Sequence, residues 1–168
     1  MIIMKVTFLL LLATGRDIYL ATSILFPSIY TYFNLDNLFE LIIVIKNNDF
    51  NLLSKRLNEL KEKNIILPIK VVKESDLFPK SCDIKNTYYL QMYLKLLASK
   101  IIKTDKYLTL DADILFFNKT DIDSFHDDKI YFFKNKKDKW VIRSCSFLQV
   151  EESDFSVNQT PFMFKTQL

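Results

Sequence analysis

Continuous apolar runs alternate with helix-like stretches in the first part of the chain. Residues 6–13 and 41–45 are almost entirely apolar or β-branched, and each run ends at a polar loop. This pattern is typical of strands that are buried on both faces of a parallel sheet. Residues 18–32 continue the first run as a helix-like segment, and residues 52–63 carry apolar side chains at helical spacing between charges. The order predicted here is strand, helix, strand, helix.

A third strand and a longer helix follow. Residues 65–72 are mostly apolar but include Pro68, which indicates an edge or irregular strand because proline cannot donate a hydrogen bond to a neighbour. Asn86 and Thr87 offer an N-cap for a helix that runs to about residue 102, and its apolar side chains recur at helical spacing. Strands therefore continue to alternate with helices of about 10 to 15 residues.

The last strong strand signal is interrupted by carboxylates. Residues 107–110 are predicted to form a strand that continues through Asp111-Ala112-Asp113 into the apolar residues 114–117. Further strands are predicted at 130–133 and 140–150. The alternation as a whole predicts an open, mostly parallel α/β sheet with helices on both faces.

Composition narrows the class of protein. The 168 residues, 49% of them hydrophobic, predict a single domain over residues 1–168. The net charge is only +3 and no long basic block occurs, so a nucleic-acid partner is not expected. Cys82 and Cys145 match neither a zinc-finger nor a disulfide spacing and are interpreted as buried thiols of a cytoplasmic protein, in the host cytoplasm if the protein is viral.

The N-terminal apolar run has two interpretations. Lys5 followed by residues 6–13 has the charge and length of a short signal peptide, but a strand is favoured. The chain's single glycine, Gly15, stands where the strand must stop, which suggests a backbone reason for it, and a helix-like segment follows directly. The run is too short to span a membrane, which takes about 18 apolar residues or more.

The predicted sheet also predicts where a ligand would bind. In such folds ligands bind beyond the carboxyl ends of the strands, so the loops 14–17, 46–49, 73–76 and 111–113 are expected at one edge. The helix entering the fourth strand begins at the same edge, so Thr87 and Gln91 are expected nearest the site, and its N-terminus favours an anion there. Lys95 lies one turn deeper, and its long side chain can still reach a phosphate.

Asp111 and Asp113 are the most specific chemical signal in the chain. Side chains two apart on an extended strand point to the same face, so both carboxylates are expected to address one divalent cation, with Ala112 turned away. The alternative is that the two aspartates cap a loop and pair with Lys or Arg. Arg16 has a similar alternative, in which it pairs with Asp17 or another neighbouring carboxylate.

Residues 89–116 resemble the helix, strand and D-x-D signature of GT-A-type glycosyltransferases, and more closely the short glycosyltransferase-like proteins of bacteria and large DNA viruses. The opening strand that ends in Thr14-Gly15-Arg16-Asp17 is similar to the start of that family. The resemblance implies a GT-A fold and a metal-dependent transferase that moves a hexosyl or deoxyhexosyl group from a nucleotide-diphospho-sugar, most simply a UDP-sugar, to a glycan or other hydroxyl acceptor.

The resemblance also implies roles for individual residues. Asp111 and Asp113 would hold Mn²⁺ or Mg²⁺ against the donor diphosphate. The remaining residues implied to contact the nucleotide-sugar are Thr14, Gly15, Arg16, Asp17, Gln91, Lys95 and Ala112. Glu152 and Asp154 are weak candidates for the base that deprotonates the acceptor. Only 55 residues follow Asp113, so the domain is expected to be truncated or minimal at its C-terminus.

Two other functions stay open. The first is a nucleotide-sugar-fold module that binds a ligand or partner without turnover. The second is a phosphatase of the haloacid dehalogenase type, in which the first aspartate of D-x-D is a nucleophile. That motif normally opens the chain, whereas here it stands at 111–113.

Overall fold

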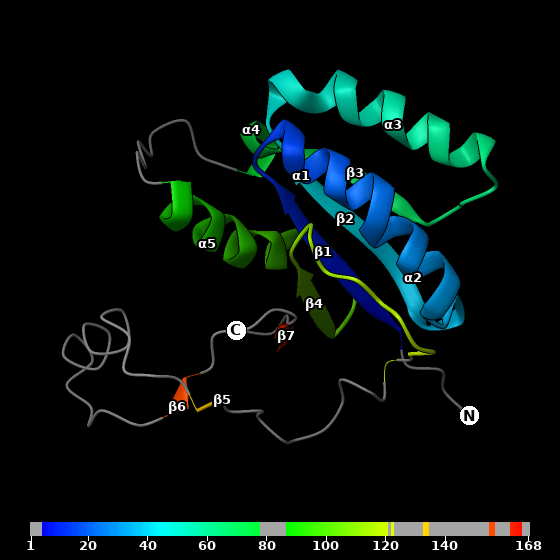
Figure 1. Cartoon of the computed structure of the whole chain (residues 1–168). Helices are drawn as coiled ribbons and strands as arrows, with labels where there is room; N and C mark the ends of the chain where they lie inside the picture. The colour runs from blue at the N-terminus through cyan, green and yellow to red at the C-terminus, as the bar shows by residue number, and fades with distance from the viewer. Residues whose placement is uncertain are drawn as a thin grey trace, which may run out of the picture.

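Five strands form the central sheet of the computed structural model, which describes residues 5–77, 87–120, 122, 133–134, 155–156 and 162–165 (Figure 1). Four neighbouring strands are parallel, and the fifth pairs antiparallel with β4 at one edge. The predicted mostly parallel α/β sheet is therefore confirmed. In spatial order the strands are β3 (Ile69–Lys73), β2 (Leu38–Ile45), β1 (Val6–Leu12), β4 (Lys106–Leu110) and β7 (Phe162–Lys165).

Strand β1 lies at the centre of this sheet, between β2 and β4. It pairs with β2 over its whole length and with β4 over four residues. Phe8, Leu9 and Leu10 are completely buried. The N-terminal apolar run is thus a core strand in this fold, as the strand interpretation predicted.

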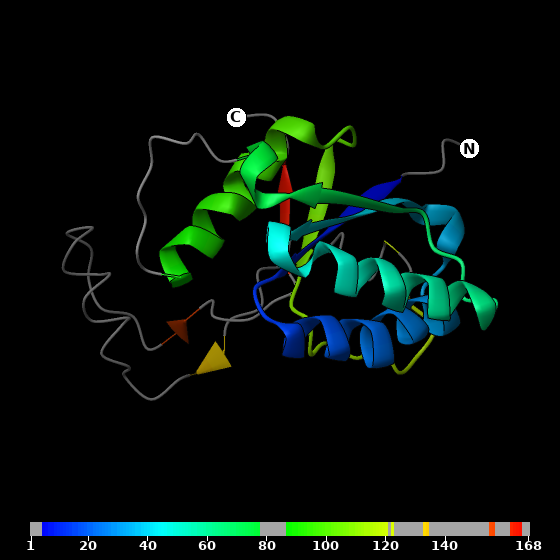
Figure 2. The ribbon, with the colours of Figure 1, turned by 90° about the horizontal axis from the view of Figure 1, so that it is seen from above.

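Helices cover both faces of the sheet (Figure 2). On one face Phe8 and Leu10 of β1 pack in a large cluster with the first two helices, and on the other face Leu9 packs in a smaller cluster with Leu94 of α5. The helical elements in chain order are α1 (Gly15–Leu20), the π-helix η1 (Ala21–Leu25), α2 (Phe26–Tyr32), η2 (Leu35–Asn37), η3 (Asn47–Asp49), α3 (Phe50–Glu62), α4 (Glu74–Leu77), α5 (Thr87–Leu97) and η4 (Ala98–Ile101).

The predicted helix over 18–32 contains a π-helical turn, η1, between α1 and α2. Pro27 has no N–H to donate to the carbonyl four residues earlier, which would break an ordinary α-helix. The chain widens just before it, and the Phe26 N–H donates to the Ala21 carbonyl five residues back. The wider turn lets α1 and α2 cross the sheet as one continuous rod.

Two strand predictions are refined. β2 begins three residues earlier than the apolar run 41–45, at Leu38. β3 is an edge strand that begins just after Pro68, and the Pro68 carbonyl accepts a hydrogen bond from the Leu41 N–H at 2.8 Å. The proline therefore stands at the entrance to the edge strand, which confirms the edge prediction.

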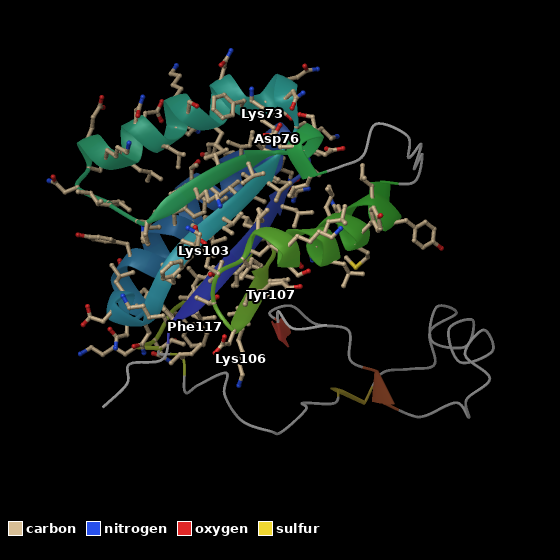
Figure 3. The ribbon with its side chains drawn as sticks, turned by 180° about the vertical axis from the view of Figure 1, so that it is seen from behind. Lys73, Asp76, Lys103, Lys106, Tyr107 and Phe117 are labelled. Atoms are coloured by element: carbon tan, nitrogen blue, oxygen red, sulfur yellow. The ribbon has the colours of Figure 1, made fainter. Side chains whose placement is uncertain are left out.

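The predicted continuation of the fourth strand into 114–117 is wrong. β4 ends at Leu110, residues 112–113 form a turn, and the Ile114 N–H donates to the Asp111 carbonyl at 3.2 Å. Two carboxylates cannot continue inside a buried strand without partners, so the chain leaves the sheet at this point. The following residues run back along the sheet toward the amino ends of its strands, where Phe116 packs against Phe8 and Thr120 bridges to Phe33; Figure 3 labels Phe117 and Lys106 at this end.

Phe116 anchors this returning segment. Its side chain is buried, its ring lies 6.2 Å from that of Phe8 and 6.1 Å from that of Phe33, and its N–H donates to the buried Ser28 hydroxyl at 3.1 Å. Further on, Thr120 forms a bridge with Phe33. The turn after β4 is therefore held by the sheet on one side and by the aromatic cluster on the other.

The expected backbone reason for Gly15 is not found. Gly15 is the first residue of α1, no glycine has a positive φ, and a Cβ added there would meet only a Leu52 methyl at 3.8 Å. We expect Gly15→Ala to leave stability unchanged or to raise it by up to about 1 kcal/mol, because alanine loses less chain entropy on folding. Urea unfolding of the two proteins measures this, and a clear loss of stability would show that the position needs glycine.

The remaining described elements form a separate two-stranded ladder. β5 (Phe133–Lys134) pairs antiparallel with β6 (Phe155–Ser156). β5 includes the last residue of the strand predicted at 130–133. The strand predicted at 140–150, the two cysteines and the proposed acceptor bases Glu152 and Asp154 lie outside the described residues.

Candidate active site at the carboxyl edge of the sheet

The carboxyl ends of β1 and β4 meet where the strand order reverses. From β1 the chain crosses to β2 and β3 on one side, whereas β4 lies on the other side. In open α/β sheets this switch point leaves a crevice, because the two loops depart in opposite directions. A cavity of about 320 Å³ opens here, lined by Leu11, Arg16, Asp17, Leu20, Gln91, Lys95, Asp111, Ala112 and Asp113.

Most of the predicted donor and metal residues line this one cavity. They come from three places in the chain: the start of α1, the middle of α5 and the turn after β4. The predicted residues present are Arg16, Asp17, Gln91, Lys95, Asp111, Ala112 and Asp113. Thr14 and Gly15 are not among the lining residues, and the Thr87 side chain lies outside the described part of the chain.

Lys95 forms an ion pair with Asp111. The Lys95 Nζ lies 3.2 Å from Asp111 Oδ1, and the Lys95 side chain is only 12% exposed whereas that of Asp111 is 47% exposed. Lys95 is therefore not on a solvated helix face. The alternative in which a D-x-D aspartate meets a lysine is what the structure shows for Asp111, and it occurs inside the cavity.

Tyr107, a residue of β4 that is labelled in Figure 3, supports the backbone of Lys95. The phenol of this buried β4 residue donates to the backbone carbonyl of Lys95 at 3.3 Å, and burial raises the pKa of the phenol. Sequence reasoning missed this residue. The available signal was a tyrosine in an apolar strand, since a buried phenol usually needs a hydrogen-bond partner.

Thr14 and Asp17 build the start of α1. The Thr14 hydroxyl accepts from the Asp17 N–H at 3.2 Å, and Asp17 Oδ2 accepts from the N–H groups of Thr14 at 2.9 Å and Ala13 at 3.1 Å. This is a reciprocal capping box. Thr14 therefore shapes the loop after β1 rather than lining the cavity.

Arg16 lies within this cap and lines the cavity. Its guanidinium makes no ion pair with any described residue, so the alternative in which it pairs with Asp17 is not observed. The Asp17 carboxylate is instead engaged by the helix cap. This arrangement leaves the Arg16 cation facing the same cavity as Lys95.

Asp111 and Asp113 share the cavity for a different reason from the one expected. They lie in a turn, not on an extended strand, so the argument from alternating side chains is wrong. No group of three or more His, Cys, Asp or Glu side chains that could hold a metal occurs among the described residues. Two carboxylates in an open cavity fit a hard divalent cation that takes its other ligands from substrate phosphates and water.

A family model matches residues 4–168, which is nearly the whole chain, and its description is a family of unknown function, DUF6492. The chain belongs to this family. No protein with a curated description matches the DUF6492 chain. Among the described residues of this DUF6492 protein, no helix is long and apolar enough to cross a membrane.

Solved structures that resemble the DUF6492 chain include the following two. One is 4-diphosphocytidyl-2C-methyl-D-erythritol synthase from Anaerococcus prevotii, with 16% identity and a TM-score of 0.53, covering 98% of this chain and 71% of the other. The second is mouse xyloside xylosyltransferase 1 in its apo form, with 17% identity and a TM-score of 0.45. The match covers 68% of the DUF6492 chain but only 46% of the xylosyltransferase.

The similarity to the synthase bears on the fold alone. The DUF6492 chain has the expected GT-A-like α/β fold. At this level of identity the similarity does not transfer an activity or a site residue. The roles of the cavity residues, the cytoplasmic location and the closeness to bacterial and viral proteins stay predictions.

Proposed function

We propose that this protein is a metal-dependent glycosyltransferase that moves a sugar from a nucleotide-diphospho-sugar to a hydroxyl acceptor. The observation that carries the proposal is the cavity at the switch point between β1 and β4. It brings two aspartates of a D-x-D turn together with two cationic side chains, Arg16 and Lys95.

The charges around the cavity favour a substrate that arrives with a divalent cation. Three carboxylates, of Asp17, Asp111 and Asp113, face two cationic side chains. A diphosphate alone would be repelled by this excess of negative charge, whereas a diphosphate bound to Mn²⁺ or Mg²⁺ would not. Without a diphosphate, Mn²⁺ or Mg²⁺ in this cavity would lack the phosphate oxygens that complete its coordination.

Each residue has a defined part in this proposal. Asp111 and Asp113 would hold the cation, which when bound supplies neutralisation of the charge that develops on the departing nucleoside diphosphate. Arg16 and Lys95 bind the phosphates, and Gln91 offers an amide to the sugar hydroxyls. Glu152 and Asp154 stay the proposed acceptor bases, and a UDP-hexose is the proposed donor.

Nucleotidyl transfer is the second candidate. Its support is that the match to the 4-diphosphocytidyl-2C-methyl-D-erythritol synthase covers 98% of the chain, and that a cavity suited to a metal diphosphate also suits a nucleoside triphosphate. The two reactions release different products. Glycosyl transfer releases a nucleoside diphosphate, whereas nucleotidyl transfer releases pyrophosphate.

A thermal-shift series tests the proposal. Nucleoside diphosphates, nucleoside triphosphates and nucleotide-sugars are added with and without Mn²⁺ to the wild type and to the double variant Asp111→Asn/Asp113→Asn. We expect nucleotides of one particular nucleobase to raise Tm, and to do so only when Mn²⁺ is present. The double variant should lose this shift. A ligand at a hundred times its Kd stabilises the folded state by about 2.7 kcal/mol, which is readily measured.

The outcomes separate the candidate functions. A shift with a nucleotide-sugar followed by release of nucleoside diphosphate supports glycosyl transfer. Release of pyrophosphate from a triphosphate would replace it with nucleotidyl transfer. A shift without any product supports the non-catalytic module, and the absence of a shift with every nucleotide overturns the proposal.

A further inference from the structure

We infer that Lys95 is the resident counterion of Asp111, and that it exchanges this carboxylate for the donor phosphates when metal and nucleotide bind together. The consequence is that the site resists divalent cations that arrive without nucleotide. The inference rests on the proposed function, because it concerns how the same cavity takes up its metal and its diphosphate.

The ion pair is placed where the proposed cation would bind. The Lys95 ammonium is 3.2 Å from Asp111 Oδ1, and both residues line the cavity together with Asp113. A divalent cation that uses both aspartates would therefore sit within a few ångströms of a positive charge. Repulsion at this distance is substantial even with water present.

The backbone of Lys95 is fixed, whereas its side chain can move. The neighbouring turns are anchored by Leu94 of α5 and Ala98 of η4, both buried, and the Lys95 carbonyl accepts from the Tyr107 phenol at 3.3 Å. The ammonium stands on a flexible four-carbon chain with rotatable bonds. Lys95 can therefore turn from Asp111 to another acceptor in the cavity without any movement of the helix.

A diphosphate provides that other acceptor. Without nucleotide, displacing the ammonium from Asp111 leaves a mostly buried cation without a partner, which is costly. With nucleotide, the ammonium gains phosphate oxygens while Asp111 gains the cation. Metal and nucleotide should therefore bind cooperatively, and each should raise the affinity of the other by the same factor.

Mn²⁺ titration followed by electron paramagnetic resonance tests the exchange without any need for turnover. The wild type and Lys95→Met are titrated with Mn²⁺ alone and then with the nucleoside diphosphate that gives the largest thermal shift. Methionine is an unbranched side chain only one atom shorter than lysine, and it removes the charge. We expect Lys95→Met to bind Mn²⁺ alone roughly tenfold more tightly, because the competing cation is gone.

The variant should also lose cooperativity. We expect the factor by which nucleotide raises Mn²⁺ affinity to fall roughly tenfold in Lys95→Met, because no ammonium remains to be transferred to the phosphates. Lys95→Arg keeps a cation at this position and should keep the weak binding of Mn²⁺ alone. Lys100→Met is the matched control, because Lys100 is an exposed lysine of η4 that does not line the cavity.

The result that overturns the inference is specific. If Lys95→Met binds Mn²⁺ alone no more tightly than the wild type, while nucleotide-dependent Mn²⁺ binding persists in the wild type, the counterion exchange is wrong and the proposed function stands. If the wild type binds neither Mn²⁺ nor any nucleotide, the proposed function fails and the inference fails with it. If Lys95→Met does not fold, the effect of the charge is measured by comparing the affinity of Lys95→Gln for Mn²⁺ alone with that of Lys95→Arg.

Discussion

Asp113→Asn is expected to slow the release of nucleoside diphosphate from the donor by about a hundredfold or more, because a lost metal ligand removes a few kcal/mol of charge stabilisation. Asp113 is the cleaner of the two aspartates to change. Its side chain is exposed, whereas changing Asp111 would also leave Lys95 without its carboxylate. Asparagine keeps the shape of the turn, so stability should change by less than about 0.5 kcal/mol. Product release and urea unfolding measure the two effects.

Asp105→Asn is the matched control for this variant. Asp105 is an exposed aspartate that precedes β4, at the opposite end of the strand from the D-x-D turn. It has the same change of charge at a distance from the cavity, so the rate should stay at the wild-type value. Equal rates for Asp113→Asn and the wild type, under conditions where the wild type turns over, would contradict a role of Asp113 in holding a cation.

Phe116→Ala is expected to destabilise the protein by about 3–5 kcal/mol, the usual cost of removing a buried phenylalanine ring. The ring packs against Phe8 and Phe33, and the backbone N–H of Phe116 is held by the Ser28 hydroxyl. Because this contact anchors the chain on the far side of the D-x-D turn, nucleotide binding should weaken as well. Urea unfolding gives the free energy of unfolding. The thermal shifts of the two proteins, compared at the same ligand concentration, give the loss of nucleotide binding.

Phe117→Ala is the control on the adjacent residue. The Phe117 side chain is 72% exposed, whereas that of Phe116 is 6% exposed. The same change of residue should therefore alter stability by no more than about 0.5 kcal/mol. Similar losses for both variants would mean that the segment after the D-x-D turn is not anchored through Phe116.

The contrast between these two phenylalanines shows where sequence reasoning ends. Residues 114–117 are four apolar residues in a row, so no alternation indicates which side chains face the core. The run by itself predicts a strand, because short apolar runs between polar residues are typical of buried strands. The packing of Phe116 against residues 8 and 33, which are far away in sequence, determines the burial.

In the candidate site too, the positions of the D-x-D side chains depend on tertiary structure. The sequence predicted that Asp111 and Asp113 would act together, but from the geometry of an extended strand that is not present. Their shared position comes instead from the end of β4 at the switch point. Likewise, Gly15 was expected to be needed for its backbone, and it has an ordinary helical start.

The sequence by itself determined the elements that depend on local patterns. Buried runs specify the parallel strands, helical spacing specifies α3 and α5, and chain order places the carboxyl ends at one edge. Tertiary structure alone decided which charges meet. Lys95 and Asp111 are sixteen residues apart, and Tyr107 reaches the Lys95 carbonyl from another element. Such contacts depend on how a helix lies against a sheet, which no local pattern encodes.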